Sequence, residues 1–127
     1  MNFVALFLLR TARGREDVSF WLLRALACDV APRYWEGTTS MARLRADLGV
    51  LRGLACARMP PLVKRLDDTG LPLELLACDW MLSLFCRVLP PRTVLRVWDW
   101  LLLEGADVLV FVALAVLRFA EEDVLQV

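Results

Sequence analysis

The sequence contains no histidine, only one lysine among its 15 basic residues, and no excess of charge of either sign. The missing imidazole excludes a Ser-His-Asp triad, a histidine general base and a histidine metal ligand within this chain. Because 15 acidic residues balance the basic ones, there is no strong positive field, and we expect no nucleic-acid partner. Disordered chains are poor in apolar residues and rich in one charge, so extensive disorder is excluded too.

Long uninterrupted apolar runs are also missing, although 59% of the 127 residues are apolar and the mean hydropathy is +0.56. A membrane-spanning helix needs about 20 nearly uncharged residues. Met1–Leu9 stops at a charged residue, Arg87 interrupts the run 80–89, and Val108–Leu117 is too short to span. We therefore predict no transmembrane segment. A chain this small cannot cover so much apolar surface alone, so we expect buried helices in a larger assembly.

The cysteines show no C-x-x-C pair, and without histidine they cannot complete a zinc site. Each follows apolar or small residues, so we predict four small buried hydrophobic side chains: Cys28, Cys56, Cys78 and Cys86. The N-terminal run lacks the cationic leader of a signal peptide, so we expect a reducing compartment. Glycine-rich nucleotide-binding motifs are missing as well, and we expect no metal and no cofactor.

The spacing of apolar residues predicts helices throughout, and therefore an all-α helical bundle in one domain or subdomain. Prolines and glycines at 32, 60–61, 70, 90–91 and 105 mark the expected boundaries. The predicted helical segments are Met1–Leu9, Asp17–Val30, Ser40 (as a cap) to Ala55, Pro60–Asp68, Leu73–Val88, Arg92–Leu103, a Val108–Leu117 helix buried on most sides, and a short piece Ala120–Gln126.

Aromatic residues fall into two groups. Trp21, Trp80 and Trp98 lie on apolar helix faces, so we predict that they belong to the core. Tyr34 and Trp35 lie in a loop that follows a proline, so we expect them to be exposed. Trp35 is then a candidate interface anchor, since tryptophan is enriched among residues that dominate binding.

Carboxylates and arginines give no catalytic signature. The pairs Glu16-Asp17 and Asp67-Asp68 and the triplet Glu121-Glu122-Asp123 are expected at helix ends as solvated caps. No pattern singles out one of the arginines as a phosphate clamp or as a residue that reaches into a partner's active site. The residues alone therefore indicate an all-helical module that works through another protein.

A series of motifs nevertheless resembles a known family. The segment 80–85 reads W-M-L-S-L-F, and it is followed by Leu89-Pro90, by the sequence V-L-R-V-W-D at 94–99, and by Glu104-Gly105. This order and spacing resembles the second half of the TBC domain, the catalytic domain of many GTPase-activating proteins for Rab GTPases. The resemblance assigns a structural role to Trp80, Leu84, Phe85, Leu89, Pro90, Arg96, Trp98, Asp99, Glu104 and Gly105. The chain departs from the family at Val110-Phe111, where Phe-Arg is usual.

The resemblance also implies what this chain does not contain. Met1-Asn2-Phe3 resembles the residues just after the family's Y-x-Q-G motif, so the catalytic glutamine, and the arginine of I-x-x-D-x-x-R, would lie upstream of Met1. We therefore expect residues 1–127 to be the C-terminal portion of a TBC domain. No catalytic residue is expected in this chain, and its partners would be the missing N-terminal half and, through the complete domain, a Rab-type GTPase.

Two readings of the function remain open, beside a third in which the chain is an unstable product without a fixed fold. In the first, the chain is an inactive fragment of a Rab GTPase-activating protein, cytoplasmic or peripheral on endomembranes. In the second, it is a non-catalytic helical interaction module that binds a Rab or another partner. The candidates for partner contact or loop support are Met1, Asn2, Phe3, Arg33, Tyr34 and Trp35.

Overall fold

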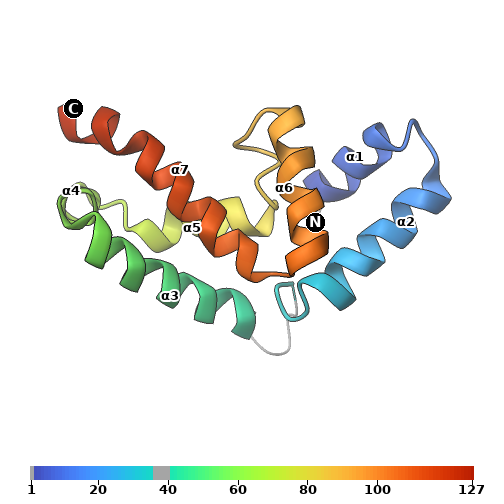
Figure 1. The fold of residues 1–127 in the computed structure, drawn as a ribbon, viewed down its shortest axis with the longest axis horizontal. Helices are drawn as coiled ribbons and strands as arrows, with labels where there is room; N and C mark the ends of the chain where they lie inside the picture. The colour runs from blue at the N-terminus through green and yellow to red at the C-terminus, as the bar shows by residue number, and fades with distance from the viewer. Residues whose placement is uncertain (1, 36–40) are drawn as a thin grey trace.

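The computed structural model describes residues 2–35 and 41–127, and every regular element within them is helical. Figure 1 shows two arms that diverge from the neighbourhood of α6, one holding α1 and α2 and the other holding α3, α4, α5 and most of α7. The all-α prediction is confirmed. The elements are α1 (Asn2–Thr11), α2 (Glu16–Arg24), the π-helix η1 (Ala25–Val30), α3 (Ala42–Arg58), α4 (Pro60–Asp68), α5 (Leu73–Leu82), α6 (Pro91–Glu104) and α7 (Asp107–Gln126).

The larger arm holds most of the core. α3 packs against α5 and α7, and α4 also packs against α7. The buried side chains recur at helical spacing, so one face of each helix points inward. They include Leu44, Leu51 and Ala55 of α3, Leu62 and Leu66 of α4, Leu73, Ala77 and Met81 of α5, and Leu109, Ala113 and Leu117 of α7.

The smaller arm has little core of its own. α1 buries Val4 and Leu8, but Ser19 is the only residue that α2 buries. η1 continues α2 with i→i+5 bonding, as in the 2.8 Å hydrogen bond from the Ala31 amide to the Leu26 carbonyl. Leu26 is buried, and η1 contacts α6. This contact and the contact of the Phe7 ring of α1 with the Trp98 ring of α6 therefore join the smaller arm to the rest of the structure.

Proline and glycine set several helix boundaries as predicted. Pro60 and Pro61 open α4, and Pro91 opens α6, because the first turn of a helix does not need a proline amide. Gly70 follows α4 with φ of 75° and Gly105 follows α6 with φ of 91°. Glycine tolerates this left-handed region because it has no Cβ. The expected cap at Ser40 lies outside the described residues, and Met41 precedes the first turn of α3.

The prediction of one helix from Leu73 to Val88 is wrong. α5 ends at Leu82, and both Leu84 and Phe85 adopt positive φ, of 48° and 63°. Their side chains do not continue a helical face with Trp80; they are fully buried in the core. Non-glycine residues adopt this conformation at a cost of about 1–3 kcal/mol each, and burial of two large apolar side chains offsets that cost.

The prediction of two separate helical pieces at the C-terminus is also wrong, here because one helix covers both. Val108–Leu117 and Ala120–Gln126 are not separate pieces, because α7 runs without a break through both. The expected burial of 108–117 on most sides is confirmed, with Phe111 and Ala115 as its exposed positions, and Phe119 beyond it is 90% exposed. The acidic residues 121–123 therefore lie within the last turns of a helix and not beside a break. No described residue of this helix or the others belongs to a span long and apolar enough to cross a bilayer.

Two further core predictions are partly wrong. Trp98 is buried and Trp80 is half-buried, but Trp21 is 62% exposed on α2. Cys28 and Cys56 are exposed, whereas Cys78 and Cys86 are half-buried, and burial raises the pKa of both half-buried thiols. Periodicity identifies the apolar face of a helix, but whether another element covers that face depends on the tertiary arrangement.

We predict that Trp98→Phe destabilises the fold far more than Trp100→Phe. The Trp98 indole Nε1 donates a 2.9 Å hydrogen bond to the buried carbonyl of Leu84, which phenylalanine would leave without a donor. The expected loss is about 2–4 kcal/mol of unfolding free energy in urea denaturation, from the lost bond and the lost volume. Trp100 is 45% exposed, so its replacement is the matched control, with an expected change within about 0.5 kcal/mol. Equal effects of the two substitutions would contradict this account.

Candidate partner-binding surface

The N-terminal candidates lie at the start of α1. Asn2 and Phe3 are exposed, and Met1 lies outside the described residues. The guanidinium of Arg87 lies 4.5 Å from the centroid of the Phe3 ring, close enough for a cation–π contact. Arg87 also pairs with Asp79 at 2.8 Å. The first turn of α1 is therefore linked to the segment that follows α5, while half of the Phe3 side chain stays available to a partner.

The second group of candidates lies in the segment before the gap at 36–40. Arg33 is exposed and has φ of 66°. The prediction that Tyr34 is exposed is wrong, because its side chain is fully buried; of the two roles predicted for it, loop support fits this position. Trp35 is half-buried, and its indole Nε1 donates a 3.1 Å hydrogen bond to the carbonyl of Leu82. Trp35 therefore holds this segment against the end of α5 and is not a free anchor.

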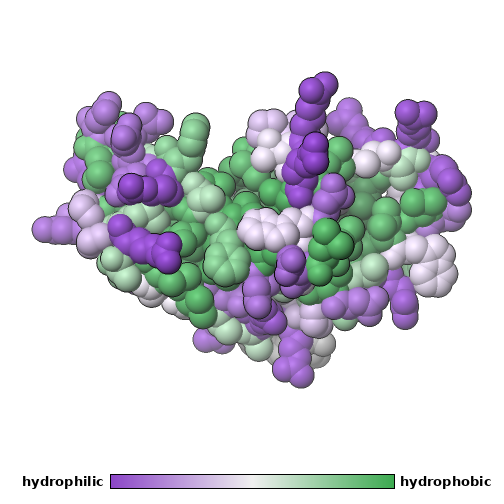
Figure 2. Space-filling view, viewed as in Figure 1, coloured by the Kyte–Doolittle hydropathy of each residue, from purple (hydrophilic) through white to green (hydrophobic). Residues whose placement is uncertain are grey.

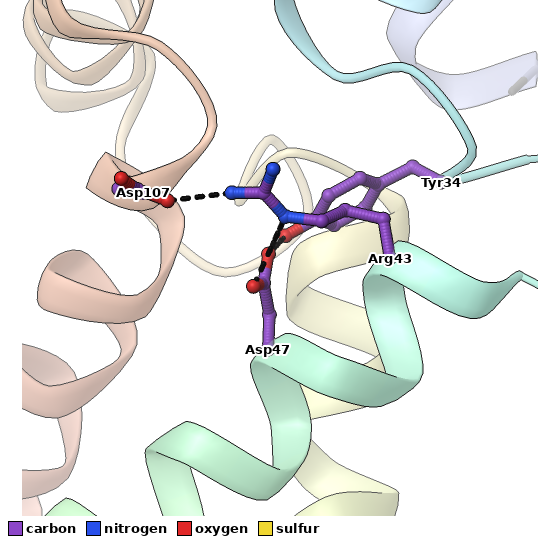
Figure 3. Close-up of polar contacts among 4 residues, drawn as sticks. All are labelled: Tyr34, Arg43, Asp47 and Asp107. Atoms are coloured by element: carbon purple, nitrogen blue, oxygen red, sulfur yellow. Dashed lines mark hydrogen bonds and ion pairs between the residues drawn. The ribbon is translucent and has the colours of Figure 1, made fainter.

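Tyr34 belongs to a polar cluster that the sequence did not reveal. Its hydroxyl donates a hydrogen bond to the carboxylate of Asp47, which is also buried. Arg43 Nε lies 3.1 Å from each Asp47 oxygen, and Arg43 Nη2 lies 2.5 Å from Asp107. Figure 3 shows that the four residues come from three parts of the chain: the segment at 34, the first turns of α3, and the start of α7. The cluster therefore joins both arms of the structure.

The electrostatics of this cluster favour a neutral phenol beside a charged pair. Burial, followed by the hydrogen bond to Asp47, raises the pKa of Tyr34 above its ordinary value of 10.0. Burial lowers the pKa of Arg43, but the hydrogen bond and charge of Asp47 outweigh burial, so the pKa of Arg43 is raised. A buried carboxylate needs such donors, because an unpaired buried charge is costly. The only sequence signal was an aspartate among the apolar positions of α3, four residues after an arginine.

The motif residues surround the turn between α5 and α6. Trp98 donates to the carbonyl of Leu84, and its ring lies 5.0 Å from that of Phe7 in an edge-to-face arrangement. Trp80 and Phe85 lie with ring centroids 6.5 Å apart. Leu89 is half-buried, and Gly105 ends α6. Four of the structural-motif candidates are exposed: Pro90, Arg96, Asp99 and Glu104.

The cysteine and carboxylate side chains of the described residues are not gathered into a candidate metal site. Within residues 2–35 and 41–127, no group of three or more cysteine, aspartate or glutamate side chains could hold a metal ion. The Tyr34 hydroxyl and the Arg43 guanidinium both bind the Asp47 carboxylate, and Arg43 also pairs with Asp107. These contacts hold the segment at 34 against α3, and α3 against the start of α7.

The order of these motifs and the two-armed helical shape match a known family. The family model of the Rab-GTPase-TBC domain matches residues 1–125 of the sequence. This chain belongs to that family. Growth hormone-regulated TBC protein 1-A of Danio rerio is 37% identical over 124 residues, which cover 98% of this chain and 34% of that protein. Growth hormone-regulated TBC protein 1 of Homo sapiens is 36% identical over 126 residues, covering 99% of this chain and 37% of its own length.

A solved structure shares both the fold and the sequence pattern. The crystal structure of the Chlamydomonas flagellar RabGAP TBC domain aligns with a TM-score of 0.82 and 36% identity. The alignment covers all of this chain and 41% of that one. The chain therefore spans about a third to two fifths of the length of these relatives. The TBC resemblance predicted from residues 80–105 is confirmed.

We predict that Tyr34→Phe lowers the unfolding free energy by about 1–3 kcal/mol, because Asp47 loses a buried donor. Asp107→Asn is the matched control, since this carboxylate is 78% exposed and its ion pair contributes less than about 1 kcal/mol. Chemical denaturation of the two variants and the parent at neutral pH measures both effects. A larger loss for Asp107→Asn than for Tyr34→Phe would contradict the role given to the buried bond.

The buried Tyr34 hydroxyl also predicts how the stability of the fold depends on alkaline pH. The folded-state pKa of Tyr34 is raised above its unfolded value of 10.0, so this stabilisation is complete below pH 10 and is lost as the pH rises toward the folded pKa. Since Tyr34 is the only tyrosine in the chain, tyrosinate absorbance reports on this residue alone. We expect tyrosinate to appear only together with loss of helical circular dichroism. Ionisation near pH 10 in the folded protein would contradict the buried contact.

Proposed function

We propose that this chain supplies the C-terminal portion of a Rab GTPase-activating domain and does not itself supply the catalytic side chains. The family match over residues 1–125 is the observation that carries the proposal. It is supported by the sequence, in which neither I-x-x-D-x-x-R nor Y-x-Q occurs and the only glutamine is Gln126. Family members use an arginine and a glutamine from these motifs, and an arginine finger alone is worth about 10³–10⁵ in rate.

In this proposal, the chain holds and extends the surface that faces the GTPase. Of the candidates within the described residues, Asn2, Phe3 and Arg33 are accessible for contact with a Rab. Tyr34 and Trp35 act indirectly, because they fix the segment that presents Arg33. Exposed apolar residues on α1 and α2 support a companion half that covers this arm: Leu6, Phe20, Trp21 and Leu22.

We predict that the chain alone leaves Rab-catalysed GTP hydrolysis at its intrinsic rate, and that a chimera restores activation. The chimera joins the part of the Danio rerio relative that precedes the matched segment to residue 2 of this chain. With both finger side chains present, phosphate release from a responsive Rab in a panel should rise by about 10³ or more. The same chimera with its finger arginine changed to alanine is the control.

The outcomes of this experiment separate the two readings of the family membership. Acceleration by the 127-residue chain alone would overturn the proposal that its catalytic groups lie elsewhere. A chimera that folds, as shown by cooperative unfolding, and yet activates no Rab would contradict the role as part of an activating domain. Binding of the chain to GTP-loaded Rab without any gain in hydrolysis in the chimera would favour the non-catalytic interaction module.

A further inference from the structure

Two hollows flank the exposed side of α7 that carries Phe111 and Ala115. The larger, of about 710 Å³, lies between α6 and α7 and includes Trp100 and Phe119 in its walls. The smaller, of about 450 Å³, lies between α7 and the end of α3. Phe111 and Ala115 line both hollows, so the two are neighbours across a shared edge. Figure 2 shows green hydrophobic surface over the middle of the molecule, where α6 and α7 lie in Figure 1, with purple side chains projecting around it.

The shared edge has the spacing of a helix-recognition surface. Phe111, Ala115 and Phe119 follow one another at intervals of four, so they form one stripe along α7. The Phe111 ring stacks on Trp100 at 6.4 Å and 21°, which braces the end of the stripe nearest the α6–α7 turn. The small side chain of Ala115 lies between Phe111 and Phe119 along the stripe, so the backbone or a side chain of another helix can approach α7 closely there. We call this stripe and its two hollows the α7 face.

The charges that line the α7 face all have one sign. Arg96 lines the larger hollow, and Arg58 and Arg118 line the smaller one; no aspartate or glutamate lines either. Arg118 pairs with Glu121 but remains 71% exposed. Within residues 2–35 and 41–127, no carboxylate lies within ion-pair distance of Arg58 or Arg96. An apolar stripe with arginines on both sides is complementary to an apolar stripe with carboxylates on both sides.

We propose that the α7 face docks an amphipathic helix of another protein, one whose apolar stripe is bordered by aspartate or glutamate. Such a helix places apolar side chains at i, i+4 and i+7 into a groove between two helices. The occupant is a helix and not a flat bilayer, because the apolar surface is hollowed on both sides of α7. The proposal is separate from Rab activation, because the α7 face includes none of Asn2, Phe3 and Arg33.

The test uses two synthetic helical peptides of about 18 residues, long enough to follow the exposed stripe. Both carry leucine at i, i+4, i+7 and i+11; one has glutamate beside the leucines and the other has lysine. Fluorescence anisotropy with the 127-residue chain should show binding of the glutamate peptide at least about tenfold tighter than the lysine peptide. Equal affinities, or no binding of the glutamate peptide, would overturn the proposal.

Variants of exposed residues locate the binding. Ala115→Glu should weaken the glutamate peptide about tenfold or more, whereas Ala57→Glu, on the exposed side of α3 and outside both hollows, should leave its affinity unchanged. The double variant Arg58→Glu with Arg96→Glu should reverse the preference between the peptides. Circular dichroism and urea unfolding show that each variant retains the fold, since all four positions are exposed.

Other occupants give distinguishable results. Sedimentation that shows a dimer dissociated by Ala115→Glu, without peptide binding, would replace the proposal with self-association. Arginine-dependent binding to phosphatidylserine vesicles without peptide binding would replace it with a membrane contact. Rab activation by the chimera described above is measured independently, so loss of peptide binding and loss of activation identify different failures.

Discussion

The hydrogen bond from the Trp98 indole to the Leu84 carbonyl is the interaction on which the arrangement of the two arms depends. It fixes a turn in which two consecutive large residues adopt left-handed backbone conformations and enter the core. The same indole packs against Phe7 of α1, so the larger arm, α6 and the smaller arm meet at one side chain. In this chain the tryptophan of α6 therefore holds the aromatic-rich segment that precedes it.

Features with a local cause were predictable from the sequence. The openings of α4 and α6 and the end of α4 follow from proline and glycine, whose backbone preferences act within one turn. The end of α5 was not predictable, because the residues at 83–88 keep a helical apolar spacing. The chain leaves the helix there because Leu84 and Phe85 gain burial in the turn, and the carbonyl of Leu84 gains a distant donor.

The exposure of the candidate contact residues could be predicted only in part, for a related reason. Phe3 and Arg33 are exposed as expected, but Tyr34 is buried because its partner, Asp47, lies 13 residues later on α3. Trp21 and Trp98 look alike in the sequence, since each lies on an apolar helix face. Trp98 is covered by the 84–85 turn and by Phe7 of α1, whereas Trp21 stays 62% exposed although α2 packs against α1. Periodicity therefore indicates which face is apolar, and the tertiary neighbours decide whether it is buried.

The π-helical segment has a consequence for the direction in which the smaller arm points. One residue advances an α-helix by about 100°, and η1 accommodates one more residue than α-helical bonding would. Deleting a single position from 25–30 would restore regular α-helical bonding and rotate α1 and α2 about the helix axis by that angle, which would move Phe7 of α1 away from Trp98. The length of η1 thus sets the direction in which α1 and α2 extend from the rest of this chain.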